Sequence, residues 1–253
     1  MDTRVRMFDI EIDNLSWEEL INTVDQALCD KSKSKYMLTV NVDHIVKMQE
    51  DKEFFNIYKE ADYITADGVP IIWASKVIKK PIKEKLSGSD IIPVILPMIE
   101  EKQYKMFFLG AAEGIAQQAA DTIKSQYKNI QIVGTYSPSY GFEKNIEENA
   151  RIINMIKKAQ PDLLLVGVGA PKQEKWIYKY KNDYNVPLSI GIGATFDFIA
   201  GNIKRAPKWM QRSGLEWFWR FMQEPKRLFR RYFIEDTQFI KILIKEIRQN
   251  KII

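Results

Sequence analysis

Cysteine and histidine are almost missing from this chain of 253 residues, which has one of each. A lone cysteine, Cys29, excludes an internal disulfide and any multi-cysteine metal site, and it suits a reducing compartment. Because His44 is the only histidine, a multi-histidine metal site is excluded, and Ser-His catalysis would have to use this one residue. We expect His44 to be a partly buried histidine that forms hydrogen bonds near the end of a strand.

Long hydrophobic runs are absent as well. The longest, such as Ile91 to Ile99 and Leu163 to Ala170, fall well short of the roughly 20 residues that a membrane-spanning helix needs. The first residues carry charges from Asp2 onward and contain no apolar region of a signal peptide. The sequence therefore predicts a cytosolic chain without a transmembrane anchor, and a membrane-surface location stays open.

Three motifs of phosphate and metal chemistry are missing: the P-loop lysine motif, H-E-x-x-H and an Asp-x-Asp pair. Enzymes that handle a nucleotide diphosphate commonly hold Mg²⁺ or Mn²⁺ with such an acidic pair. Without it, Lys or Arg side chains, backbone amides and helix dipoles have to neutralise the diphosphate. The sequence therefore predicts no metal site and no bound cofactor.

Positive charge is concentrated at the end of the chain. Residues 201–253 contain 13 Lys and Arg against 5 Asp and Glu, a balance of +8, whereas residues 1–200 contain 25 against 28, a balance of −3. Nine aromatic residues are interleaved with the basic residues of this tail. We expect a core of residues 1–200 followed by a basic, aromatic and helical appendage of residues 201–253.

Short β-branched and aromatic runs alternate with longer helical patterns through the first 200 residues. Strands are expected at 36–41, 63–65, 105–109, 130–133, 162–166 and 188–191. Helices are expected at about 16–30, 43–60, 70–78, 89–101, 113–127, 145–159 and 171–182. The alternation predicts an α/β, Rossmann-like fold with a mostly parallel sheet and helices on both faces.

Three local patterns refine this expectation. Ser16-Trp-Glu-Glu19 has the spacing of a capping box at a helix N-terminus. The continuous apolar run at 162–166 is typical of a central strand that is buried on both sides. The alternating segment from Arg4 to Asp13 is expected to form a hairpin at an edge of the sheet.

Unusual loops follow five of the expected strands, at 39–44, 65–70, 110–114, 167–174 and 191–197. In an open parallel sheet the ligand crevice lies at these carboxyl ends. Glycines there, such as Gly110 and Gly169, let the backbone approach a phosphate closely, which favours nucleotide binding. Neither Gly167/Gly169 nor Gly191/Gly193 completes G-x-G-x-x-G, so glycines in plain strand-to-helix turns remain an equal alternative for any one loop.

Two charged residues in these regions are candidates for catalysis. Asp67 follows a strand and precedes Gly68 and Pro70, so its carboxylate faces the crevice and could act as a general base. The alternative is a helix cap, since Asp caps helices and Pro is common in their first turn. Lys85 precedes an expected helix start and is placed to neutralise a phosphate, its alternative being a solvated surface lysine.

Ten short motifs are found in order along the chain. They are Thr39-Val-Asn-Val-Asp-His44, Ala66-Asp-Gly68, Leu86-Ser-Gly-Ser-Asp90, Phe108-Leu-Gly110, Pro161-Asp162, Gly167-Val-Gly-Ala-Pro-Lys-Gln-Glu174, Gly191-Ile-Gly-Ala-Thr-Phe-Asp197, Arg205-Ala-Pro207, Gly214-Leu-Glu-Trp217 and Glu224-Pro-Lys-Arg227. Each is modest alone, but the ordered set resembles the WecG/TagA/CpsF glycosyltransferases from the first strand to the final helices.

The resemblance implies an inverting, metal-independent enzyme that transfers an N-acetylmannosamine-type sugar from a UDP-sugar to a sugar on a polyprenyl diphosphate. Such enzymes build precursors of wall teichoic acid and other surface polysaccharides. Carried over by motif, Asp67 becomes the proposed base, Thr39 and Asn41 would line the donor or acceptor pocket, and Gln173 and Asp197 would contact the donor. Gly110 and Gly169 are expected to bind substrate because of their positions in the loops after the strands. The family usually has Arg where this chain has Lys85, which keeps the charge and loses the bidentate geometry.

The resemblance also gives the appendage a role, because TagA-type members close the active site with a C-terminal segment that docks on the membrane. Trp and Tyr suit a membrane interface, and Lys and Arg suit an anionic leaflet. We expect a peripheral protein on the inner face of the cell membrane, with Arg220, Arg227 and Arg231 reaching headgroups or the substrate diphosphate. These three would share a face of a continuous helix, although Pro225 stands between the first and second. A helical dimer or packing element is the alternative.

Two other function classes are weaker. A nucleotide-sugar epimerase or NAD-dependent Rossmann enzyme lacks its dinucleotide fingerprint here and a Tyr-x-x-x-Lys pair after a suitable strand. A nucleic-acid-binding module could use the basic tail, but the acidic core and the family resemblance argue against this partner. The donor sugar and the oligomeric state, including a homo-oligomer, are left open by the sequence.

Overall fold

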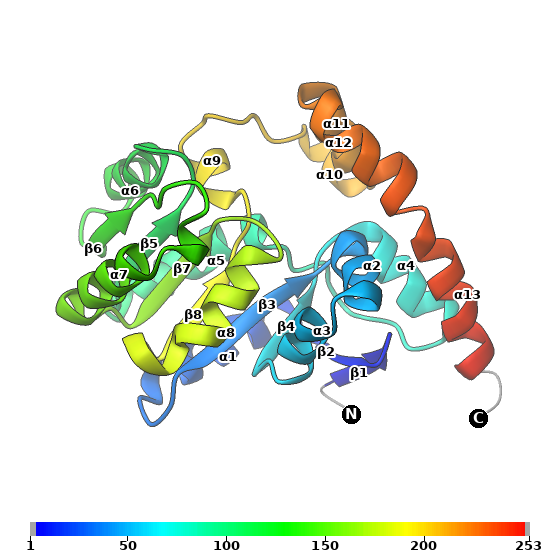
Figure 1. Ribbon diagram of the computed structural model, residues 1–253, viewed down its shortest axis with the longest axis horizontal. Helices are drawn as coiled ribbons and strands as arrows, with labels where there is room; N and C mark the ends of the chain where they lie inside the picture. Colours follow the sequence, from blue (N-terminus) through cyan, green and yellow to red (C-terminus); the bar gives the residue numbers. More distant parts are fainter. Residues whose placement is uncertain (1–3, 251–253) are drawn as a thin grey trace.

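The computed structural model describes residues 4–250, apart from the side chains of Gln211, Arg212, Arg227, Arg231, Ile234 and Asn250. Its centre is a six-stranded parallel sheet with the order β4-β3-β8-β7-β5-β6 (Figure 1). The strands are β3 (Lys35–Val40), β4 (Tyr63–Ala66), β5 (Lys105–Gly110), β6 (Gln131–Tyr136), β7 (Leu163–Gly167) and β8 (Leu188–Gly191). All six expected strands are confirmed, and the apolar run at 162–166 is an interior strand, as predicted.

The opening segment forms the expected hairpin, of β1 (Arg4–Met7) and β2 (Ile10–Asp13), but not at an edge of the main sheet. It is a separate two-stranded sheet. The Asp13 carboxylate connects it to the core, because Oδ2 accepts a hydrogen bond of 2.7 Å from the backbone N–H of Ile64 and Oδ1 accepts one of 3.0 Å from Arg4 Nε. The hairpin is therefore joined to the main sheet by side-chain hydrogen bonds of Asp13, and not by the backbone hydrogen bonds between strands that an edge position would have required.

Alternate residues of each strand point to opposite faces of the sheet, and each face has its own apolar core. Leu164 and Val166 belong to one core, and Leu163 and Leu165 belong to the other. Helices cover both faces, as expected (Figure 1). They are α1 (Trp17–Cys29), α2 (Val42–Glu50), α3 (Lys52–Lys59), α4 (Val69–Val77), α5 (Gly88–Glu101), α6 (Ile115–Gln126), the 3₁₀ turn η1 (Phe142–Lys144), α7 (Ile146–Ala159), α8 (Lys172–Tyr184) and α9 (Thr195–Ile199).

Polar side chains set several helix boundaries. Ser16 and Glu19 form the predicted capping box at the start of α1, with hydrogen bonds of 3.2 and 2.6 Å. The single helix expected over 43–60 is wrong, because the chain breaks it at Asp51 into α2 and α3. The Asp51 carboxylate accepts a hydrogen bond of 3.0 Å from Phe54 N and so begins a new helix.

The tail is helical, as expected, and crosses the molecule from the top of Figure 1 down its right edge. Its elements are α10 (Lys208–Arg212), α11 (Glu216–Gln223), α12 (Pro225–Arg230), the π-helical turn η2 (Arg231–Glu235) and α13 (Gln238–Asn250). Phe239 of α13 is buried against Phe8 of the hairpin, with ring centroids 5.5 Å apart. Within residues 4–250, every helix is too short or too polar to span a bilayer.

Candidate active site

Two neighbouring strands bring Asn41 and Asp67 together at the carboxyl edge of the sheet. Val40 and Ala66 are paired in the parallel register, so the residue that follows each strand lies beside its counterpart. Asn41 Nδ2 donates a hydrogen bond of 3.5 Å to Asp67 Oδ2, while Asn41 Oδ1 caps α2 by accepting from His44 N at 3.2 Å. The structure therefore brings both residues together at the carboxyl edge of the sheet.

Thr39 and His44 pack beside the Asn41–Asp67 contact, which we call the Asn41–Asp67 corner. Both are buried, and the Thr39 carbonyl oxygen lies 2.9 Å from His44 Nδ1 and accepts a hydrogen bond of 2.8 Å from the Tyr58 hydroxyl. The expectation of a buried, hydrogen-bonded histidine is confirmed. These contacts use the backbone of Thr39, and the residue as a whole is 7% exposed.

Asp67 is not the cap of the helix that follows it. The N-cap position of α4 is Gly68, at φ +99°, and no side chain caps the helix. Burial raises the pKa of the Asp67 carboxyl above its ordinary value. The charge of Lys85 lowers this pKa, the charge of Glu216 raises it, and the Asn41 hydrogen bond and the charge of Arg220 lower it. A carboxyl with a raised pKa, at the carboxyl edge of the sheet and under the influence of several charged groups, is suited to accept a proton.

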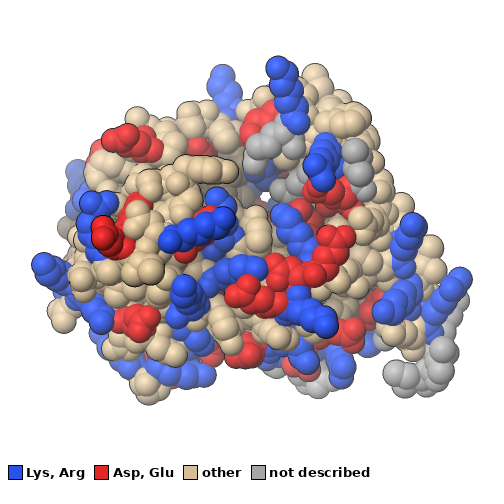
Figure 2. Space-filling model, in the orientation of Figure 1, with Lys and Arg blue, Asp and Glu red and all other residues tan. Residues whose placement is uncertain are grey.

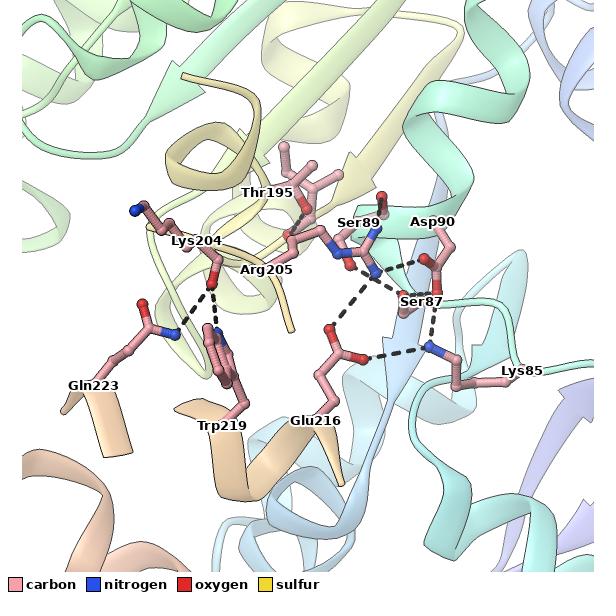
Figure 3. A network of polar contacts seen from close by, with 11 residues as sticks. Lys85, Ser87, Ser89, Asp90, Thr195, Lys204, Arg205, Glu216, Trp219 and Gln223 are labelled. Carbon is pink, nitrogen blue, oxygen red and sulfur yellow. Dashed lines mark hydrogen bonds and ion pairs between the residues drawn. The ribbon is translucent and has the colours of Figure 1, made fainter. Parts of the chain in front are cut away.

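Lys85 is half-buried in an ionic cluster, which the alternative of a solvated surface lysine does not describe (Figure 3). Lys85 Nζ donates a hydrogen bond of 2.7 Å to Asp90 Oδ2, and Ser87 Oγ donates one of 2.6 Å to the same oxygen. Although burial alone would lower the pKa of Lys85, Asp90 and Glu216 raise it, so the side chain keeps its charge.

Arg205 and Glu216 complete the cluster, and sequence reasoning gave neither a role. Arg205 Nη2 donates a hydrogen bond of 2.6 Å to Asp90 Oδ1. The Glu216 carboxylate lies 3.6 Å from both Lys85 Nζ and Arg205 Nη2. One signal was available, since Glu216 is among only five acidic residues of the basic tail and lies in the first turn of α11.

The appendage brings Arg220 to the same place. Its guanidinium lies 5.5 Å from the centroid of the Phe198 ring, and its buried Nε has no hydrogen-bond partner within the side chains that the structure describes. Gly214, at φ +76°, lets the appendage pass close to Val69, which lies two residues after Asp67 in the sequence. A Cβ at position 214 would meet Val69 Cγ1 at 3.1 Å. The continuous helix considered for the three arginines is wrong, since α11 ends at Gln223 and α12 begins at Pro225. The side chains of Arg227 and Arg231 lie outside the described residues.

Gln173 and Asp197 are held by partners of their own. Gln173 Oε1 accepts from Gly193 N at 3.1 Å and Nε2 donates to Glu174 Oε1 at 2.8 Å, so this buried amide braces the loop after β8. Burial raises the pKa of Glu174 to about 7. Asp197 Oδ1 accepts from Asn202 Nδ2 at 2.9 Å, at the turn where the appendage begins.

The two candidate glycines have different surroundings. A Cβ at Gly110, whose φ is +136°, would lie 2.4 Å from the carbonyl oxygen of Gly167, so glycine is needed for the close approach of β5 and β7. At Gly169, with φ +81°, a Cβ would meet nothing within 4 Å. Only Gly169 therefore leaves open space beside its backbone, as a site for a phosphate requires.

The model of the glycosyl transferase WecG/TagA/CpsF family matches residues 5–252. The chain belongs to this family. A similar relative is an N-acetylglucosaminyldiphosphoundecaprenol N-acetyl-beta-D-mannosaminyltransferase of Bacillus subtilis, 29% identical over 214 residues, which are 85% of this chain and 81% of the relative. A Staphylococcus aureus protein of the same name is 25% identical over 226 residues, 89% of this chain and 87% of the relative.

Within this WecG/TagA/CpsF member, Lys85 is expected to be needed for its charge. Lys85→Ala should slow sugar transfer by roughly 10²-fold, because one cation of the candidate site is lost, whereas Lys85→Arg should retain activity within a few-fold. The rate of transfer is measured as product formed. Lys83→Ala is the matched control, since Lys83 pairs with Glu19 at 2.7 Å, away from this cluster. If Arg is as damaging as Ala, the role of Lys85 is not electrostatic.

Proposed function

We propose that this family member is an inverting glycosyltransferase that moves N-acetylmannosamine from its UDP derivative to N-acetylglucosamine on a polyprenyl diphosphate. The product would enter the synthesis of wall teichoic acid or a related surface polysaccharide. The names of the relatives support the sugar and the acceptor. The observation that carries the proposal is the Asp67 carboxylate beside Asn41 at the carboxyl edge of the sheet, where the charges of Lys85 and Arg220 act on it.

The reaction assigns a separate task to each of these groups. Asp67 takes the proton of the acceptor hydroxyl as its oxygen attacks the anomeric carbon, so the new C–O bond forms opposite the diphosphate. The bond from the anomeric carbon to the phosphate oxygen breaks, and UDP leaves with the electron pair. Lys85 and Arg220 stabilise the charge that grows on the diphosphate. The neutral sugar is transferred, and the proton stays on Asp67 until solvent removes it.

The appendage supplies the surface for a lipid-linked acceptor. Large apolar side chains of residues 209–244 are exposed: Trp209, Leu215, Trp217, Phe218, Met222, Phe229, Phe233, Ile240 and Ile244. Lys and Arg stand at the top and along the right edge of the space-filling view, where α11 to α13 lie (Figure 2). Aromatic and basic side chains together favour the interface of an anionic membrane, so we place the protein peripherally on the inner face of the cell membrane.

A UDP-release screen tests the proposed function. The full-length protein is given a series of UDP-sugars, each with and without lipid-diphosphate-linked N-acetylglucosamine. We expect release with UDP-N-acetylmannosamine, and only when the acceptor is present. Release with another UDP-sugar would change the donor assignment. No release with any pair, or NAD(P) retained through purification, would reject the transferase.

The same assay tests metal independence. In the described part of the chain, no group of three or more His, Cys, Asp or Glu side chains is arranged to hold a metal ion. We therefore expect turnover to persist in excess EDTA, with Lys and Arg neutralising the diphosphate. Loss of turnover in EDTA, restored by Mn²⁺ or Mg²⁺, would contradict this charge scheme.

A further inference from the structure

The Glu216 carboxylate bridges two cations that come from different parts of the chain. One oxygen lies 3.6 Å from Lys85 Nζ, in the loop before α5, and the other lies 3.6 Å from Arg205 Nη2, at the root of the appendage (Figure 3). Glu216 itself is in the first turn of α11. An anionic group with one oxygen toward each of two cations has the geometry with which a phosphate is usually bound.

Asp90 holds the same two cations from another side, and much more closely. Its oxygens accept hydrogen bonds of 2.7 Å from Lys85 and 2.6 Å from Arg205. Among the described residues, the Glu216 carboxylate makes only the two longer ion pairs and accepts no hydrogen bond. Asp90 therefore fixes the cations in place, while Glu216 occupies the position in front of them without a tight bond.

Arg205 has a further donor that is not satisfied. Its Nε is buried and has no hydrogen-bond partner among the described residues, and its guanidinium lies 5.9 Å from the centroid of the Phe198 ring. A buried donor without an acceptor costs free energy, so such a group indicates a ligand. The guanidinium of Arg220 lies 5.5 Å from the centroid of the same ring, and its buried Nε likewise lacks a partner in the described part of the chain. Two unsatisfied guanidinium donors beside one ring suit a multiply charged oxyanion.

We propose that Arg205 binds the diphosphate of the donor together with Lys85, and that Glu216 occupies this subsite as an internal carboxylate until the donor displaces it. The identity of the donor rests on the proposed function, whereas the anion subsite does not. The four side chains Lys85, Arg205, Asp90 and Glu216 balance to zero charge, so a diphosphate cannot add while Glu216 stays in front of the cations. Binding of the donor thus requires the Glu216 side chain to move away from Lys85 and Arg205.

The test measures binding of UDP and of inorganic pyrophosphate to the full-length protein by calorimetry. Glu216→Gln keeps the shape and removes the competing charge, so both probes should bind about tenfold more tightly, a change of about 1.4 kcal/mol. Arg205→Gln should weaken both at least tenfold. Glu235→Gln is the matched control in the appendage, because Glu235 pairs with Arg230 at 3.0 Å, and it should change neither affinity.

The other possible results distinguish failure of the anion subsite from failure of the proposed function. Affinity that is unchanged or weaker in Glu216→Gln, with a lower melting temperature, would make Glu216 a clasp for the appendage and overturn the inference. Failure of wild type and variant to bind either probe would overturn it too. If Glu216→Gln binds pyrophosphate more tightly while no UDP-sugar is turned over, the anion subsite stands and the proposed function fails. If transfer occurs but both affinities are unmoved, the inference alone fails.

Discussion

Replacing Asp67 by asparagine is expected to lower turnover by roughly 10²–10⁴-fold, the usual contribution of one general base. Asparagine keeps the size and the contact with Asn41 but cannot take the proton of the acceptor hydroxyl. Single-turnover transfer and UDP binding are measured on the same preparation, and UDP affinity should change little. Asp62→Asn is the matched control, because Asp62 precedes the same strand at its opposite end and pairs with Lys33 at 2.9 Å.

The stability of this variant separates a base from a structural carboxylate. Because the folded state holds the Asp67 proton more tightly than the unfolded chain does, this group destabilises the fold as pH rises from about 3.8 through its raised pKa. Above the raised pKa the full cost is present, so at such a pH Asp67→Asn should melt at the same temperature as wild type or higher. A variant that melts lower and keeps near-normal turnover would make Asp67 structural and direct attention to Asp197.

The pH dependence of turnover carries the same assignment. The base must be ionised to act, so kcat/KM should rise with pH through the raised pKa of Asp67. Since Lys85 lowers this pKa and Glu216 raises it, the acid limb should move to higher pH in Lys85→Ala and to lower pH in Glu216→Gln. An acid limb that is the same in both variants would show that another group is the base.

A chain that ends at Asn202 is expected to lose binding to phosphatidylglycerol vesicles and at least roughly 10²-fold in turnover, while its sheet still forms. All eight strands and the Asn41–Asp67 corner precede the cut. Arg220 and its charge beside Asp67 are removed with the appendage, which accounts for the loss of turnover. Activity is measured on a short, water-soluble acceptor as well, because that substrate does not require a membrane.

Stability is expected to fall in the truncated chain, since α13 covers part of the core. Phe239 is buried against Phe8, and removing a buried phenylalanine costs about 3–5 kcal/mol. Phe239→Ala in the full chain is therefore the control, because it should lower the melting temperature and retain transfer. Full activity of the truncated chain on the soluble acceptor would reduce the appendage to a packing element.

Features set by neighbouring residues could be predicted from the sequence. The strands were predictable because short runs of β-branched and apolar residues are typical of buried strands. The capping box was predictable because Ser16 and Glu19 are three residues apart. The break at Asp51 was missed, since both helices continue the same apolar pattern and only the Asp51 carboxylate separates them. The hairpin was predicted as local structure, but its place depends on Asp13 reaching Ile64, 51 residues away.

The candidate site was predictable only where a strand end placed a residue. Asp67 and Asn41 follow paired strands, so parallel register alone brings them together. The cluster around Lys85 depends instead on the path of the appendage, which brings Glu216 within 3.6 Å of Lys85, and a periodic sequence pattern does not predict such a path. Its helix spacing was also unreliable as a guide, because the chain breaks between Arg220 and Arg227.

Asp90 holds Lys85 and Arg205 with separate oxygens of one carboxylate, so the contacts of these three residues depend on one another. A substitution of Lys85 or Arg205 keeps the contact only if the new side chain still reaches the same Asp90 oxygen. A substitution of Asp90 removes or changes both contacts at once. Substitutions here should therefore be epistatic, with effects that do not add. Engineering a new donor preference is better begun at positions outside this triad, where single changes can be accepted one at a time.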